Sequence, residues 1–172
     1  MYSFNNTRRC NAFPNYVYLV ENRYEEGKPS GSLEVPDRWH GDEKIVLDSE
    51  SVYGLIVQGD EPIGEGVSIG MTYSQIKNVQ GKIMMGYSGL AYTLINGKVW
   101  TLHFLLSDDE KKILDEKIRE LTEGNGGLYY TTKIDLTELG LDPVCHAAYI
   151  YNTDNGLRTG ESASEIIESL KQ

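Results

Sequence analysis

Short runs of apolar, β-branched and aromatic residues recur along this chain, and clusters of glycine, proline, asparagine and charged residues separate them. Such runs are typical of β-strands, and the separating clusters are typical of turns and loops. The pattern predicts a loop over 21–42 and a turn over 48–51. The strands that it predicts are 16–20, 44–47, 52–58, 90–95, 98–105, 128–134 and 144–151.

The clearest hairpin signal is Asn96-Gly97, which lies between two apolar runs. Asn-Gly favours a type I′ turn, because both central residues of that turn need positive φ. A two-residue loop pairs Ile95 with Lys98, and therefore Tyr92 with Thr101. One face of the hairpin then carries Ala91, Thr93, Ile95, Trp100, Leu102 and Phe104, and the other carries Leu90, Tyr92, Leu94, Val99, Thr101, His103 and Leu105. Neither face is plainly polar, so we expect helices on one side and more protein, or a partner, on the other.

Three Ser or Thr residues are each followed, three positions later, by Glu or Gln. This spacing is the capping box, in which each side chain bonds the other residue's free backbone N–H at the start of a helix. The pairs are Thr72 with Gln75, Ser107 with Glu110, and Ser162 with Glu165. They predict helices over Thr72–Gln80, Ser107–Thr122 and Ser162–Lys171.

These elements together predict an α+β fold, with one mainly antiparallel sheet and three helices packed mostly on one face. A chain of 172 residues is long enough for one domain with an ordinary core. Residues 1–14 have no clear pattern and are predicted to be a loose amino-terminal segment. The remaining residues, 15–172, are predicted to form a single domain.

The net charge of −10 argues against nucleic acid as a partner, because phosphate binding needs a basic surface. A surface of this sign attracts a basic protein, although it also serves simply to keep a protein dissolved. No apolar run approaches the ~20 residues that cross a bilayer. The first nine residues include Arg8 and Arg9 but no apolar stretch follows them, so a secretory signal is not expected. We therefore expect a cytoplasmic protein, or a secreted one if a signal peptide has been trimmed away.

Residues that carry chemistry are few and scattered. The histidines His40, His103 and His146 are far apart in the sequence, and no metal-ligand spacing links them. Cys145 and His146 are neighbours on a predicted strand, so their side chains should point to opposite faces and should not form a catalytic dyad. Cys10 and Cys145 are expected to be reduced thiols, and they could pair only if the amino-terminal segment lies beside the Cys145 strand. We therefore expect no catalytic residues, no metal and no cofactor.

Twelve tyrosines are a different kind of signal. Tyrosine is enriched at recognition surfaces because it offers a large, rigid contact area, but its preference for strands also explains its abundance here. We place the candidate binding site on the hairpin face that has no obvious cover. Its residues are Tyr92, Leu94, Val99, Thr101 and His103.

The segment from Val67 to Gly81 resembles the repeat of the β-lactamase-inhibitory-protein family and of the related small lipoproteins of the outer-membrane barrel-assembly machinery. The matching residues are Ile69, Gly70, Met71, Thr72, Ile76 and Gly81. The resemblance implies a helix-plus-sheet unit whose concave sheet grips another protein. This chain departs from the inhibitors in lacking a second copy of the repeat and their disulfides, and from the lipoproteins in lacking a lipid-attachment signal.

The expected function is that of a non-catalytic protein-binding protein, an inhibitor or an immunity factor that binds a basic partner. One alternative is a secreted or envelope domain that acts as a structural adaptor. Another is an enzyme or a small-ligand-binding protein that uses the sheet face around Tyr92 and His103.

Overall fold

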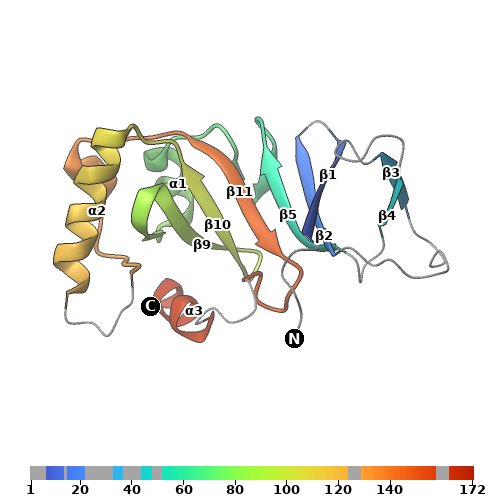
Figure 1. The fold of residues 1–172 in the computed structure, drawn as a ribbon. Coiled ribbons are helices and arrows are strands. Elements are labelled where there is room, and N and C mark those ends of the chain that lie inside the picture. Colours follow the sequence, from blue (N-terminus) through green and yellow to red (C-terminus); the bar gives the residue numbers. More distant parts are fainter. Residues whose placement is uncertain are drawn as a thin grey trace.

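The chain has an α+β fold built on an antiparallel sheet, as the sequence predicts (Figure 1). The computed structural model describes residues 7–13, 15–21, 33–36, 44–47, 52–123, 129–157 and 163–172. The main sheet contains, in spatial order, β1 (Thr7–Phe13), β2 (Tyr16–Glu21), β5 (Val52–Gln58), β11 (Cys145–Tyr151), β10 (Lys98–Phe104), β9 (Leu90–Ile95) and β8 (Met84–Met85). Two small antiparallel pairs join β3 (Leu33–Pro36) to β4 (Lys44–Leu47) and β6 (Pro62–Gly64) to β7 (Val67–Ser68).

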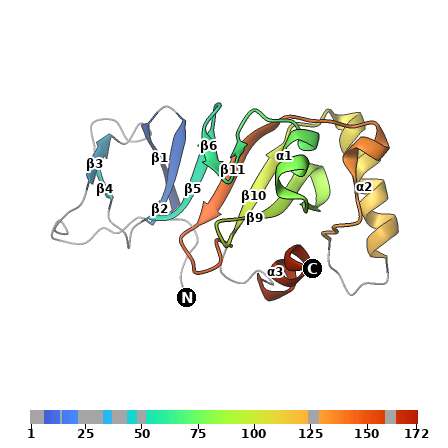
Figure 2. The same cartoon turned by 180° about the vertical axis from the view of Figure 1, so that it is seen from behind.

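Helices lie on both faces of the sheet (Figures 1 and 2). Among the described residues the helices are α1 (Tyr73–Gln80), α2 (Asp108–Thr122) and α3 (Ala163–Lys171), and the short 3-10 turns are η2 (Tyr87–Gly89) and η3 (Leu136–Leu139). The buried side chains of α1 and α2 belong to the main core, together with one face of β9 and β10. The buried side chains of α3 pack against the opposite face of the same two strands.

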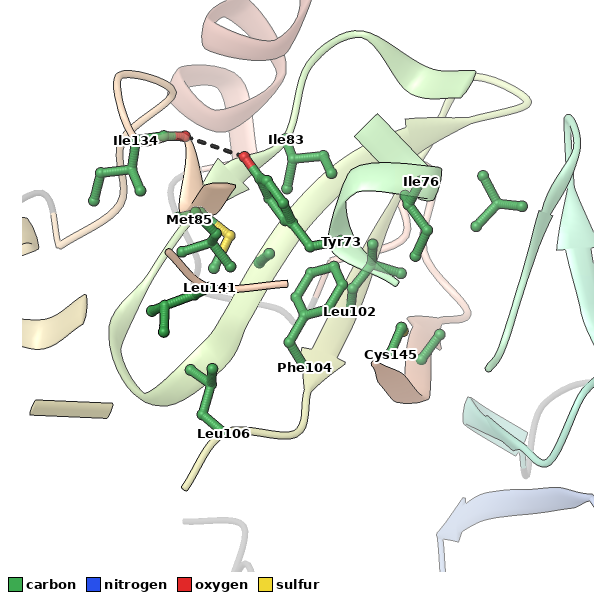
Figure 3. Close-up of a cluster of buried hydrophobic side chains, with 14 of the residues drawn as sticks. Tyr73, Ile76, Ile83, Met85, Leu102, Phe104, Leu106, Ile134, Leu141 and Cys145 are labelled. Carbon is green, nitrogen blue, oxygen red and sulfur yellow. Dashed lines mark hydrogen bonds between the residues drawn. The ribbon is translucent and has the colours of Figure 1, made fainter. Parts of the chain in front are cut away.

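The main core centres on two aromatic rings (Figure 3). The rings of Tyr73, in α1, and Phe104, in β10, meet edge to face, with 5.6 Å between their centroids. Both side chains are completely buried. The Tyr73 hydroxyl donates a hydrogen bond of 3.2 Å to the carbonyl of Ile134, so its polar atom is satisfied inside the core. Burial of this hydroxyl raises the pKa of Tyr73 above its usual value, whereas the charge of Lys77 lowers it.

The predicted hairpin is confirmed. Ile95 pairs with Lys98, and Tyr92 pairs with Thr101. Asn96 and Gly97 have φ angles of 52° and 77°, the two positive values that a type I′ turn needs. The predicted cover is present on both sides of β9 and β10, because α1 and α2 lie on one side and α3 on the other.

Two of the predicted capping boxes are confirmed. At α1, the amide of Thr72 donates to the Gln75 side chain at 2.9 Å, and the amide of Gln75 donates back to the Thr72 hydroxyl at 3.4 Å. At α2, Ser107 and Glu110 make the same exchange at 2.8 and 3.3 Å. The third predicted box contains Ser162, which lies outside the described residues.

Residues 7–13 are not the loose segment that the sequence predicts, because they form β1 and pair with β2. Such a polar run can serve as a strand here because β1 is the edge of the sheet and needs a hydrogen-bonding partner on one side only. The predicted loop over 21–42 likewise contains β3, which pairs with β4.

The predicted strand over 128–134 is wrong for the residues described there. Thr131 alone makes a β-bridge, to Met85, and the chain then turns into η3. The hydroxyl of Thr131 accepts a hydrogen bond from the amide of Lys133. Such a local bond competes with the hydrogen bonds of a strand, which explains why these β-branched and aromatic residues do not form one.

Candidate functional site

The sheet register places the predicted site residues on one face but divides them between two environments. Thr101 pairs with Tyr92 on β9 and with Tyr149 on β11, and Tyr149 pairs with Ile56 on β5. Directly paired residues of neighbouring strands share a face. The face that carries Tyr92 therefore continues from β9 through β10 and β11 to β5.

The β9 side of this face is covered by α3. Tyr92 is only 4% exposed and Val99 is completely buried, both in one cluster with Ile166 and Leu170 of α3. Leu94 is partly buried and packs against the same cluster. The expectation that Tyr92 lies open as a binding anchor is therefore wrong, because the carboxy-terminal helix covers it.

Thr101 and His103 are half-buried and lie on the next strand, toward β11. Here the structure adds His146, which the sequence did not connect with this site. The rings of His103 and His146 lie with their centroids 4.4 Å apart and an angle of 51° between their planes. We refer to these two residues as the histidine pair.

A β-bulge brings the histidine pair together. His103 is paired with Ala147 and the next residue, Phe104, with Cys145, so His146 is an extra residue in β11. A bulge changes the direction of a side chain and is found often beside functional sites. Sequence spacing alone does not reveal such an insertion, which is why the two histidines looked unrelated.

Three tyrosines lie further along the same face and form what we call the tyrosine cluster. Tyr53, Tyr149 and Tyr151 are half-buried and pack around the buried side chains of Ile56 and Ala147. The rings of Tyr53 and Tyr151 stack, with 6.4 Å between centroids and 23° between planes. The alternation of Ala147, Tyr149 and Tyr151 along β11 is the sequence signal that could have located this cluster.

At the other end of the histidine pair, two large apolar side chains are exposed. Leu105 is 63% exposed and Val144 is 41% exposed, and the amide of Leu105 donates to the carbonyl of Val144 at 2.8 Å. Each lies next to a residue buried in the main core, Phe104 or Cys145, and so points away from that core. We refer to the tyrosine cluster, Thr101, the histidine pair, Leu105 and Val144 together as the β11 face.

The electrostatics of the β11 face favour a neutral His103. Burial lowers the pKa of His103, and the positive charges that His146 and Lys111 can carry lower it further. Around this face, Asp154 follows β11, and α3 carries Glu165 and Glu168; all three are exposed. The face is therefore apolar and aromatic, with acidic residues on α3 and after β11 and with the cationic Lys111 of α2 near His103.

Cys145 does not contribute to this face. It is completely buried in the main core, on the side of β11 opposite His146, as the alternation of strand residues predicts. Its thiol is free, and burial raises its pKa to about 11. Such a thiol stays protonated at neutral pH and is a poor nucleophile. The side chain of Cys10, its predicted alternative partner, lies outside the described part of the chain.

Two absences among the described residues concern metal binding and membrane insertion. Within them, no group of three or more His, Cys, Asp or Glu side chains is placed to hold a metal ion. None of the helices that the structure describes is both long enough and apolar enough to span a bilayer.

Comparisons of the chain with protein-family models, with curated proteins and with solved structures find no match. The resemblance between the segment Val67–Gly81 and the β-lactamase-inhibitory-protein repeat therefore stays a prediction.

Proposed function

We propose that this chain is a non-catalytic protein-binding protein that recognises a basic partner protein through the β11 face. The observation that carries the proposal is the gathering of tyrosine, histidine and exposed apolar side chains beside the part of the sheet that α3 covers. Large exposed apolar side chains next to half-buried aromatic rings are the usual composition of a recognition surface.

The position of β11 inside the sheet favours recognition of a partner protein through side chains rather than through the backbone. β11 lies between β5 and β10 and pairs with both, so its backbone groups are used within the sheet. A partner cannot extend the sheet at this point and has to contact the side chains of the face. Tyr149, at the centre of the face, is our leading anchor, because truncation of a central aromatic residue commonly causes the largest loss of binding energy.

The charge of the chain favours a basic partner. The net charge is −10, and exposed acidic residues stand on α3 and after β11, close in sequence to the face. Opposite charge speeds the encounter between two proteins and disfavours acidic competitors. An inhibitor or an immunity factor is the role that this combination of charge and surface supports best, and a structural adaptor is the alternative.

The test starts with a photo-crosslinking phenylalanine analogue in place of Tyr149 and, as the control, in place of Tyr129. Tyr129 is 57% exposed and lies against Tyr87 rather than in the β11 face, so it matches Tyr149 in chemistry but not in position. We expect the Tyr149 position to capture one basic protein from the native host and the Tyr129 position not to capture it. Mass spectrometry identifies the captured protein.

The second step measures binding of that protein to the wild-type chain and to two variants. Tyr149→Ala should weaken binding by about 30-fold, or ~2 kcal/mol, whereas Tyr129→Ala should leave it unchanged. The association rate should fall as salt rises, because exposed charges are screened over ~8 Å at physiological ionic strength. An acidic partner, a rate indifferent to salt, or capture at the Tyr129 position alone would contradict the proposal.

A further inference from the structure

One ring nitrogen of the histidine pair is buried without a hydrogen bond. The Nδ1 atom of His146 is inaccessible to solvent, and no donor or acceptor in the described part of the chain bonds to it. Buried polar atoms nearly always have a partner, and an unpaired one costs about 1–3 kcal/mol. An atom of this kind calls for a ligand, either a water molecule or an ion.

A second imidazole beside this atom supplies a second nitrogen ligand for an ion. His103 lies beside His146, with the ring centroids 4.4 Å apart and the planes inclined at 51°. Zinc binds imidazole nitrogens at ~2.0–2.1 Å, so two rings this close can both reach one ion that lies between their edges. A bridging water molecule would also use both imidazoles, so the titration below has to separate it from a metal ion.

We propose that His103 and His146 together bind one divalent transition-metal ion of the zinc, nickel and copper class. Imidazole nitrogen suits these ions, whereas magnesium and calcium prefer oxygen ligands. With two ligands from the protein, the remaining positions are open to water or to a ligand from another molecule. Both residues are half-buried, so part of each ring faces solvent, whereas the Nδ1 atom of His146 does not. This inference does not depend on the proposed protein partner.

Isothermal titration calorimetry with zinc chloride, nickel chloride, copper chloride or magnesium chloride tests the site. We expect one zinc, nickel or copper ion per wild-type chain and no binding of magnesium. His103→Gln and His146→Gln should each lose this binding. His40→Gln is the control, because it also removes one histidine; His40 lies outside the described residues, and its replacement should not change the titration.

A spectroscopic readout keeps the test independent of how the variants fold. In the wild-type chain with copper, electron paramagnetic resonance should show hyperfine coupling to two imidazole nitrogens. With zinc, the ring-nitrogen NMR signals of His103 and His146 should shift together. Failure of all three transition ions to bind, binding that both glutamine variants retain, or loss of binding in His40→Gln would each overturn the proposal.

Discussion

Two glycines with nearly the same φ angle have very different surroundings. Gly97 has a φ of +77°, and a Cβ atom added there meets nothing within 4 Å. Gly156 has a φ of +80°, but a Cβ atom there would lie 2.5 Å from the carbonyl oxygen of Val99. At Gly97 a substitution is opposed by the backbone angle alone. At Gly156 it is also opposed by the backbone of β10.

We therefore predict that Gly97→Ala lowers the free energy of unfolding by about 1 kcal/mol, the usual consequence of forcing an L-residue into positive φ. Gly156→Ala should lower it by clearly more, because the β10 backbone has to move as well. Urea unfolding of the two variants beside the wild type measures both values. Equal losses of unfolding free energy in the two variants would contradict the packing at Gly156. An unchanged unfolding free energy in Gly97→Ala would contradict the type I′ turn.

The carboxylate of Asp135 joins α1 to the start of η3. Its carboxylate accepts a hydrogen bond from the Lys77 ammonium, and it also accepts from the backbone amide of Thr137, which caps η3. These contacts hold the pKa of Asp135 below its usual value, with the Lys77 hydrogen bond as the largest cause. Because the folded pKa is depressed, the stabilisation is present above the unfolded value of 3.8 and is lost as the pH falls through the folded value.

Asp135→Asn tests this ion pair while it keeps a side chain that can cap η3. At pH 7 the variant should be less stable by about 0.5 kcal/mol, a typical value for a partly exposed ion pair. The difference from the wild type should shrink as the pH falls below 3.8, because the unfolded chain takes up the proton there, and it should disappear once the pH is below the folded pKa. Thermal unfolding between pH 2.5 and pH 7 measures this difference. A gap that stays constant over the range would show that the charge is not responsible.

At the scale of single elements, α1 is held at its start by a long-range contact that α2 lacks in the described residues. The carboxylate of Asp142 accepts hydrogen bonds from both the amide and the hydroxyl of Ser74, at 2.8 and 2.9 Å. Asp142 therefore acts as a second cap for α1, in addition to Thr72. The start of α2 depends on Ser107 and Glu110.

Replacing Thr72 or Ser107 with Ala should each lower the free energy of unfolding by about 0.5–2 kcal/mol. Ser107→Ala should lower the free energy of unfolding more than Thr72→Ala does, because Asp142 still bonds the first turn of α1 when the Thr72 hydroxyl is absent. Chemical denaturation of the two single variants provides the comparison, and Ser162→Ala extends it to the third predicted box. Two neutral substitutions would mean that the caps do not stabilise these helices.

The elements that could be predicted from the sequence are those with local signals. Capping boxes placed the starts of two helices, and Asn96-Gly97 determined the hairpin register. β1 lacked such a signal, since it is a polar edge strand that takes its form from pairing with β2. The candidate site was found only in part, because the cover that α3 gives to Tyr92 and the bulge at His146 both depend on contacts between distant segments.

At the scale of the whole molecule, the sheet order explains why the candidate site lies on β11 rather than on the predicted hairpin. α3 covers β8 and β9, and the face continues past it onto β10, β11 and β5. The hairpin is local, so its register could be predicted. The residues that pair with β11 are about 40 to 100 positions away in sequence, so their pairing could not. The binding residues are therefore shared among strands that meet only in the finished fold.

The place of β11 in the sheet also sets the order in which the protein can be completed on the ribosome. β5 and β10 are both made before β11, and β11 is the strand that lies between them. Until it emerges, each of these two strands has an unpaired edge, and the halves β1-β2-β5 and β10-β9-β8 are separate sheets. Pairing between distant segments is slow to form, and open edges favour association with other chains. The growing chain is therefore most exposed to aggregation until residues 145–151 have emerged, and the β11 face forms in the same step that closes both edges.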